Sequence, residues 1–322
     1  MNRNFPMYAA PAFDAASAAE AAEDELRYAG VFPPRVKTIA FISPASYPDD
    51  ASHRRGIELV EKVGYEVKVM PHAFTQPAEG RDSAPLADRL ADFYAAWNDP
   101  EVDMVICVRG GWGCKALLAK LDWSALEKRP ELYFQGFSDI TLITCALLAK
   151  GYGHPVAGPN AGSMAKLRDP FIGWMRAMYH GETVGPYKLD ALVPGDCAGL
   201  PLVGLLDRLD RIADEDYRPD TGGRIIFIES VGSTPDVIRA QLQKLLDRKF
   251  FAGAAGVVFC SFVRCGGESD IDAVLKEFAP RTGVPVYCGL PFGHTENCAT
   301  IDFGRRAVVQ NGELTFPATD GK

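Results

Sequence analysis

Apolar runs of strand length alternate with helical patterns through most of this chain, and this alternation constrains its fold. Residues 38–42 and 102–108 are apolar runs of strand length. Residues 52–63 and 85–98 carry apolar side chains at helical spacing. Alternation of this kind predicts an α/β fold with a mostly parallel sheet and helices on both faces. Functional groups on such sheets gather at the carboxyl ends of the strands.

The length of 322 residues predicts two domains, because a single ordinary core is smaller. We expect an N-terminal arm over residues 1–35, packed on the body or on a partner subunit, or else disordered. A first domain over 36–168 and a second over 199–322 follow from the pattern of strands and helices. Residues 169–198 are expected to link them, since this stretch becomes rich in glycine and proline.

Composition excludes several classes of function. The net charge of −8 argues against nucleic acid or an anionic membrane as a partner. No apolar run is long enough to span a bilayer, and the first residues lack the apolar core of a signal peptide. The eight cysteines are scattered and form no CxxC pair, which favours reduced thiols. We therefore expect a cytoplasmic protein with no nucleic-acid or membrane partner, no metal and no cofactor.

A glycine-rich turn at 109–113 joins an apolar strand directly to a helical pattern that begins at Cys114. Gly110, Gly111 and Gly113 allow backbone conformations that other residues avoid. The N-terminus of a helix favours thiolate over thiol, so this position predicts Cys114 as an activated nucleophile. The alternative is a buried cysteine packed for its size.

A thiol nucleophile needs a base and a group that orients the base. Of the five histidines, His294 lies in a glycine-bracketed loop after a predicted strand, where it can project into a cleft. Glu229 ends an apolar strand, where a carboxylate is costly to bury unless it is paired. The order Cys114, Glu229, His294 is that of α/β hydrolases. The alternatives are a loop histidine that caps a turn and a solvated glutamate at a strand edge.

Four motifs resemble the LD-carboxypeptidases, peptidase family S66, and they occur in that family's order. The segment at 109–114 resembles R-G-G-Y-G-S, that at 136–141 resembles G-[YF]-S-D-I-T, and those at 227–229 and 293–294 resemble F-L-E and G-H. The resemblance covers residues 37 to about 310. It implies an N-terminal Rossmann-like domain, a smaller β-rich C-terminal domain, an active site between them, and a homodimer.

The same resemblance implies a nucleophile–glutamate–histidine triad. In this chain it carries over to Cys114, Glu229 and His294, with cysteine in place of the family's serine. A thiolate is intrinsically more nucleophilic than a hydroxyl, so we expect an active enzyme.

Further site residues are expected around this triad. The backbone N–H groups of Lys115 and Gly111 are predicted to form the oxyanion hole. Ser138 and Asp139 are predicted to bind substrate. Arg109 is a candidate for the same role, or else braces the glycine turn.

The implied function is hydrolysis of the L,D-amide that links a diamino acid to terminal D-alanine in murein tetrapeptides, during peptidoglycan recycling. One alternative is the family branch that hydrolyses acyl-adenylate peptide antibiotics, although that branch carries acidic residues where this chain has Trp112-Gly113. A glutamine-amidotransferase-like enzyme would carry G-x-C-x-G, whereas Lys115-Ala116 follows the cysteine here. The last alternative is a non-catalytic protein that binds muropeptides.

Overall fold

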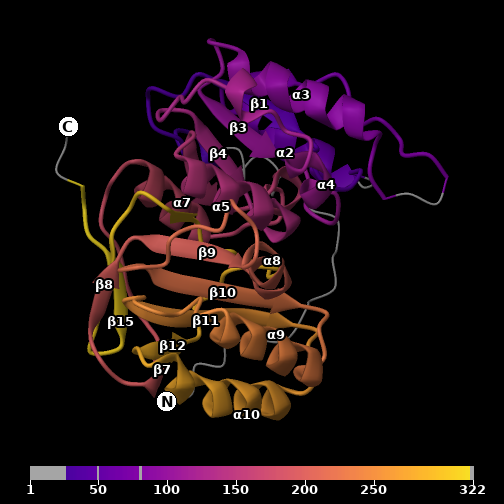
Figure 1. Ribbon diagram of the computed structural model, residues 1–322. Coiled ribbons are helices and arrows are strands. Elements are labelled where there is room, and N and C mark those ends of the chain that lie inside the picture. Colours follow the sequence, from indigo (N-terminus) through magenta and orange to yellow (C-terminus); the bar gives the residue numbers. More distant parts are fainter. Residues whose placement is uncertain (1–26, 49–50, 80–81, 320–322) are drawn as a thin grey trace.

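The computed structural model of the protein describes residues 27–48, 51–79 and 82–319. These residues form two α/β domains stacked one above the other (Figure 1), which confirms the predicted fold class. The N-terminal domain is built on a sheet with the order β13-β5-β4-β3-β1-β2. Its parallel strands are β1 (Thr38–Ile42), β2 (Glu66–Val69), β3 (Met104–Cys107), β4 (Tyr133–Gly136) and β5 (His154–Ala157).

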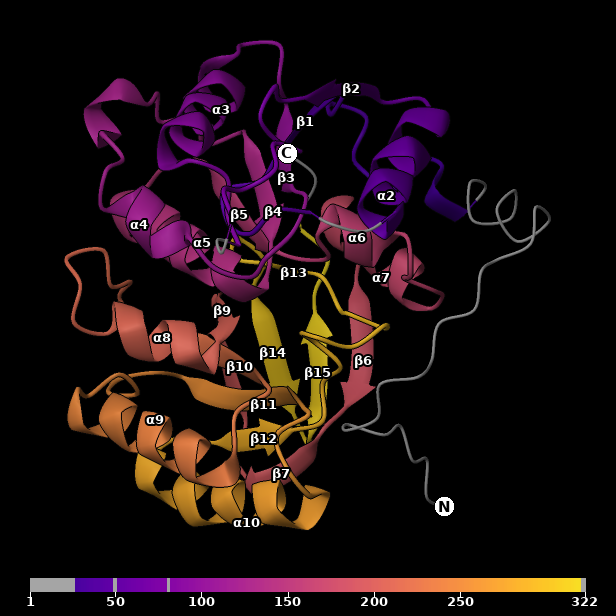
Figure 2. The same ribbon diagram turned by 90° about the vertical axis from the view of Figure 1, so that its right-hand side faces the viewer.

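Helices cover both faces of this sheet, as the alternating pattern predicts. In Figure 2, α2 (Ala51–Lys62) and α6 (Ala161–Met164) lie on one side of the strands. On the other side lie α3 (Leu86–Asn98), α4 (Cys114–Leu118) and α5 (Thr141–Lys150). Two short 3₁₀ helices, η1 (Trp123–Ala125) and η2 (Ser138–Ile140), complete the loops after α4 and β4.

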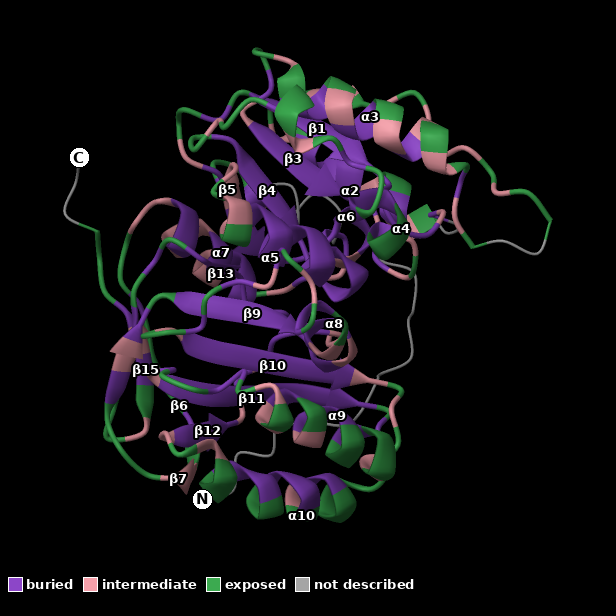
Figure 3. Ribbon diagram, viewed as in Figure 1, coloured by how far each residue is buried: buried purple, intermediate pink, exposed green. Residues whose placement is uncertain are grey.

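The C-terminal domain holds two sheets. The larger one places β9 (Pro201–Leu205), β10 (Ile225–Val231), β11 (Gly256–Val263) and β12 (Val286–Cys288) in parallel, with β7 (Asp190–Val193) antiparallel at the edge. Its helices are α8 (Leu206–Ile212), α9 (Pro235–Asp247), α10 (Glu268–Phe278) and η3 (Ala279–Thr282). Figure 3 shows β9 and β10 buried and the outer faces of α9 and α10 exposed. Strands covered on both faces are continuous apolar runs, as β11 is.

The smaller sheet is antiparallel and was not predicted. It has the order β6-β15-β14-β8, from β6 (Val184–Lys188), β8 (Cys197–Gly199), β14 (Ala307–Gln310) and β15 (Glu313–Phe316). Residues 169–198, expected to be a linker, therefore contribute α7 (Phe171–Tyr179), β6, β7 and part of β8. All three strands are short, β6 contains glycine and proline, and β8 ends in glycine, so these sequences lack a clear strand signal.

The chain crosses between the domains more than once. After β12 it returns to the N-terminal sheet, where β13 (Ile301–Asp302) pairs antiparallel with β5. The domains also meet where α5 packs against α8 and β9, and there the Leu205 N–H donates to Thr141 Oγ1 at 3.1 Å.

Most of the predicted N-terminal arm, residues 1–26, lies outside the described residues. The end of the arm packs on the body: Tyr28 and Phe32 are buried, and the Tyr28 hydroxyl donates to the Met164 carbonyl at 2.7 Å.

Candidate active site

Ser138 stands at a sharp corner between β4 and the helical segment η2–α5. It is a non-glycine residue with φ of +69°, a left-handed conformation that is strained for an L-amino acid. A serine held in this conformation between a strand and a helix is the arrangement called a nucleophile elbow. The corner therefore presents the Ser138 hydroxyl at the carboxyl edge of the N-terminal sheet.

His294 joins Ser138 to Glu229 across the two domains. Its Nε2 lies 3.0 Å from Ser138 Oγ, and its Nδ1 lies 3.0 Å from Glu229 Oε2. With Nδ1–H donated to the carboxylate, Nε2 is left as the acceptor for the serine hydroxyl. Phe137 packs against the imidazole ring with its centroid 5.1 Å away. The three side chains thus form a hydroxyl–imidazole–carboxylate chain, and both predicted partners, Glu229 and His294, lie in it.

Glu229 is fully buried in the last part of β10, and its Oε1 has no hydrogen-bond partner. The carboxylate is therefore held through its other oxygen, Oε2, which is hydrogen-bonded to His294 Nδ1. Gly293 makes this contact possible: its φ is +114°, and a Cβ there would lie 2.8 Å from three carbon atoms of the Glu229 side chain. Glycine is required here both by conformation and by space.

The prediction of an activated Cys114 thiolate is wrong. Cys114 does begin α4, but its side chain is fully buried, and His294 Nε2 pairs with Ser138 instead. Burial raises the pKa of the Cys114 thiol well above its usual value, and the nearby Asp139 carboxylate raises it further. A helix of five residues supplies little dipole to oppose these effects. Cys114 is the buried cysteine that the sequence left open as the alternative.

The glycine turn lies against Ser138. A Cβ on Gly110 would lie 2.7 Å from the Ser138 Cβ, so any larger residue at position 110 would clash with the serine. Gly111 faces the same cavity as Ser138. Lys115 does not line that cavity, and its ammonium pairs instead with Glu215 at 2.9 Å.

A cavity of about 280 Å³ opens beside Ser138 and His294. Two cationic side chains, Arg109 and Lys166, contribute to its wall. Arg109 also braces the neighbouring loop, because its Nη1 donates to the Tyr47 carbonyl at 2.6 Å. The cavity therefore combines a hydroxyl–imidazole pair with positive charge.

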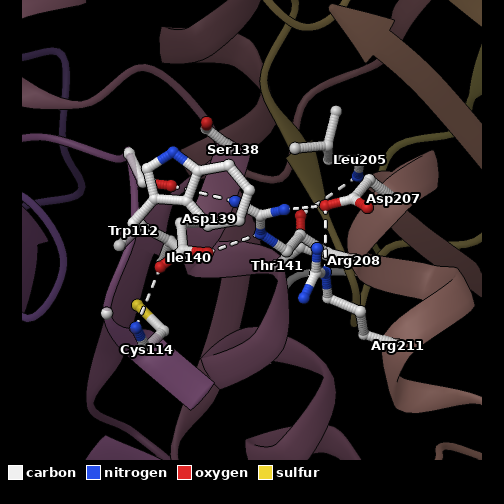
Figure 4. Close-up of polar contacts among 12 residues, drawn as sticks. Trp112, Cys114, Ser138, Asp139, Ile140, Thr141, Leu205, Asp207, Arg208 and Arg211 are labelled. Carbon is white, nitrogen blue, oxygen red and sulfur yellow. Dashed lines mark hydrogen bonds and ion pairs between the residues drawn. The ribbon is translucent and has the colours of Figure 1, made fainter. Parts of the chain in front are cut away.

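Asp139 does not face the cavity as a substrate ligand would. It is buried, and its carboxylate accepts the Cys114 N–H at 2.9 Å and a guanidinium N–H from Arg208 (Figure 4). Arg208 was not predicted, because three other charged residues, Asp207, Asp210 and Arg211, lie in the same short helix, and charged helix residues are usually solvated.

The described ranges contain neither a metal-binding cluster nor a membrane-spanning helix. Nowhere in residues 27–48, 51–79 and 82–319 do three or more histidine, cysteine, aspartate or glutamate side chains gather in a way that could hold a metal ion. In the same ranges no helix combines the length and apolarity needed to cross a membrane.

Two family models match most of the chain. Residues 39–156 match the LD-carboxypeptidase N-terminal domain, and residues 198–309 match the LD-carboxypeptidase C-terminal domain. Ser138 lies within the first match, and Glu229 and His294 lie within the second.

Individual proteins are similar over nearly their whole length. The Streptomyces coelicolor protein named "Putative carboxypeptidase SCO6489" is 30% identical over 86% of this chain and 92% of its own. The crystal structure of a muramoyltetrapeptide carboxypeptidase from Oxalobacter formigenes has a TM-score of 0.74 and 27% identity, covering 88% of this chain and 99% of that one. An MccF-like protein from Bacillus anthracis shares the fold, with a TM-score of 0.77 and 20% identity over 88% of this chain and 97% of that one.

Proposed function

The chain belongs to the LD-carboxypeptidase family and is a hydrolase, and from this premise we propose its substrate and its catalytic residues. It cleaves the L,D-amide between a diamino acid and terminal D-alanine in murein tetrapeptides, with Ser138 as nucleophile, His294 as base and Glu229 as the orienting carboxylate. The observation that carries this proposal is the hydrogen-bonded chain from Ser138 Oγ through His294 to Glu229 at the wall of the cavity.

The geometry supports acyl transfer in two halves. Ser138 Oγ attacks the scissile carbonyl carbon while His294 Nε2 takes the hydroxyl proton, and the tetrahedral intermediate then collapses as that proton passes to the leaving amine of D-alanine. Water attacks the resulting ester with His294 again as base, releasing the shortened peptide and regenerating the serine. Glu229 holds Nδ1–H throughout and stabilises the imidazolium.

Two backbone N–H groups are suited to the oxyanion. In a nucleophile elbow the residue after the serine donates one of them, and here that residue is Asp139. The second comes from the glycine turn at Gly111, which lines the cavity beside Ser138. This assignment keeps Gly111 from the sequence analysis and replaces Lys115. Removing one such donor typically costs on the order of 100-fold or more in rate.

The charge of the cavity supports a substrate that ends in a free carboxylate. Arg109 and Lys166 bring two cationic side chains to the wall that also holds Ser138. A charge-assisted hydrogen bond to the terminal carboxylate would set the position of the last residue and exclude chains that continue beyond it. This property separates a carboxypeptidase from a general amidase.

The cell-wall role is proposed as recycling of murein peptides by a cytoplasmic homodimer. The cysteine side chains support a reducing compartment, since all eight are free and buried. Ser138, His294 and Glu229 together argue against a protein that only binds muropeptides.

The decisive experiment is one incubation followed by mass spectrometry. L-Ala-γ-D-Glu-meso-diaminopimelate-D-Ala should release D-alanine and the tripeptide without added metal or nucleotide. The same peptide ending in L-alanine, and its C-terminal amide, should be poor substrates. An intact tetrapeptide beside rapid cleavage of a peptidyl acyl-adenylate would replace this substrate with the antibiotic class. Failure to cleave either would favour a binding protein.

A further inference from the structure

One arginine of the C-terminal domain reaches into the corner that holds the proposed nucleophile. Arg208 lies in α8 and is only 3% exposed. Its Nε donates to Asp139 Oδ1, and its Nη2 donates to the Gly111 carbonyl at 3.0 Å. Figure 4 shows the Arg208 guanidinium beside Asp139. Both Asp139 and Gly111 belong to the N-terminal domain.

The two groups that Arg208 binds belong to the two segments proposed to form the oxyanion hole. Asp139 follows Ser138 directly, and Gly111 belongs to the turn that packs on Ser138. The N–H groups of these residues can act together only if both segments keep a fixed spacing. A planar guanidinium with several donors holds two acceptors at a fixed spacing, which a lysine ammonium does not.

The surroundings of Arg208 keep the guanidinium in one place. The Trp112 ring covers it, with the guanidinium carbon 4.1 Å from the ring centroid, and the Asp207 carboxylate accepts a further N–H. The other Asp139 oxygen accepts the Cys114 N–H at 2.9 Å. Through its two carboxylate oxygens, Asp139 thus connects the start of α4 with Arg208.

Burying the Arg208–Asp139 ion pair costs desolvation free energy, so stabilising the domain interface alone does not explain why an arginine is present. Desolvating two charges can cancel their attraction, and apolar side chains of similar size often hold a contact at least as well. A contact between α8 and the N-terminal domain that needed only stability would be served by leucine or methionine. Arg208 provides geometry that apolar side chains lack, namely simultaneous hydrogen bonds to Asp139 and Gly111.

We propose that Arg208 is a positioning residue for the oxyanion hole, fixing the backbone at Asp139 relative to the backbone at Gly111. It touches neither the substrate nor the reacting atoms, and acts through these two segments. Because it comes from the domain that also supplies Glu229 and His294, it aligns the hole with the base. This inference depends on the proposed function for the identity of the nucleophile and of the two N–H donors.

The test compares Arg208→Met with Arg211→Met, a matched control in the same helix. Arg211 also contacts Asp207, at 3.1 Å, and the Trp112 ring, at 5.4 Å, but its side chain is 42% exposed. No contact joins Arg211 to Asp139 or Gly111 among the hydrogen bonds of the described residues. We expect Arg208→Met to lower kcat by about 100-fold with KM changed less than about threefold, and Arg211→Met to change either by less than about twofold.

A second measurement separates positioning from stability and from the choice of substrate. A fluorophosphonate reacts with an activated serine hydroxyl: the Ser138 oxygen–phosphorus bond forms, fluoride leaves, the proton passes to His294, and the phosphoryl oxygen occupies the oxyanion hole. Arg208→Met should slow this labelling by about the same factor as kcat, while its affinity for the tripeptide product stays within about threefold of wild type. If the wild type is labelled at Ser138 but leaves the tetrapeptide intact, the proposed substrate is wrong and the role of Arg208 is still measured.

Three results would overturn the inference. The first is a folded Arg208→Met enzyme with wild-type kcat and labelling rate, and the second is a loss confined to KM. If Arg208→Met does not fold, Arg208→Lys is the second variant. It keeps the positive charge beside Asp139 but loses the planar guanidinium, so the fluorophosphonate should label its Ser138 about tenfold more slowly or worse. A wild-type labelling rate in Arg208→Lys is the third result, and it would show that charge alone suffices.

Discussion

Two strand-to-helix corners stand on neighbouring parallel strands of the N-terminal sheet, and each carries a nucleophilic side chain near the start of its helix. The corner after β3 leads to Cys114, and the corner after β4 leads to Ser138. At the first corner the positive φ values belong to Gly111 and Gly113, whereas at the second the serine itself has φ of +69°. Only the second side chain reaches His294. The residue that takes the left-handed conformation is the one aimed at the cavity.

Removing the Ser138 hydroxyl at the second corner is expected to have the largest effect on kcat. Ser138→Ala should lower kcat by roughly 10⁴-fold or more, because the nucleophile and its base act as one unit. Cys114→Ala should keep kcat within about threefold of wild type, since this thiol is buried behind the site. Steady-state release of D-alanine measures both. Full activity in Ser138→Ala would contradict Ser138 as the nucleophile and favour Cys114 instead.

Glu229 offers the next largest effect. Glu229→Gln should reduce kcat by about 10³- to 10⁴-fold, because an amide neither fixes the His294 tautomer nor stabilises the imidazolium. Circular dichroism should show that the variant remains folded. Near-wild-type turnover in a folded variant would mean that His294 is oriented by some other group.

Gly293 tests how tightly the histidine is seated. Gly293→Ala places a methyl group 2.8 Å from the Glu229 side chain at a φ of +114°. We expect a loss of about 1–3 kcal/mol in the free energy of unfolding and a fall in kcat of about 100-fold. Urea denaturation and steady-state kinetics measure the two. An alanine variant as stable and active as wild type would show that the loop can move aside.

The positive charge of the cavity is tested by Lys166→Met, with the exposed Lys120→Met outside the cavity as control. Losing a charge-assisted bond to the terminal carboxylate should cut the preference for acid over amide substrate by about tenfold or more, mostly through KM. The ratio of kcat/KM for tetrapeptide acid and tetrapeptide amide measures this preference. An unchanged ratio would assign carboxylate recognition to other groups.

The smallest effect concerns the Cys114 thiol at alkaline pH. Burial raises its pKa well above 9.0, so the native thiol should stay neutral and resist iodoacetamide at pH 9. The unfolded thiol ionises near its ordinary pKa, so the free energy of unfolding should fall as pH rises past about 9. Mass spectrometry after timed alkylation reads the reactivity, and denaturant titrations of wild type and Cys114→Ala compare the slopes. Rapid native labelling of Cys114 would contradict its burial.

The sequence predicted the parallel architecture and placed Glu229 beside His294, but it directed His294 to Cys114, whereas His294 Nε2 lies beside Ser138. Three glycines before Cys114 suggested a sharp turn that presents a nucleophile, but there the glycines themselves take the unusual backbone conformations. The segment that was overlooked is Gly136-Phe137-Ser138, between a strand and a helix, where the serine itself has φ of +69°. Arg208 had no local signal for its role, because Asp139 and Gly111, the two groups it binds in the N-terminal domain, are far away in sequence. The antiparallel sheet was missed because β6 pairs with β15, a strand from the far end of the chain.

The loop that carries His294 leaves β12 in one sheet and enters β13, which is hydrogen-bonded to β5 in the other. The two ends of this loop are therefore held by different domains. A change in the spacing of the two sheets would therefore displace the His294 loop, because its two ends would move with different domains. The 3.0 Å contact between His294 Nε2 and Ser138 Oγ thus depends on how the two domains are spaced.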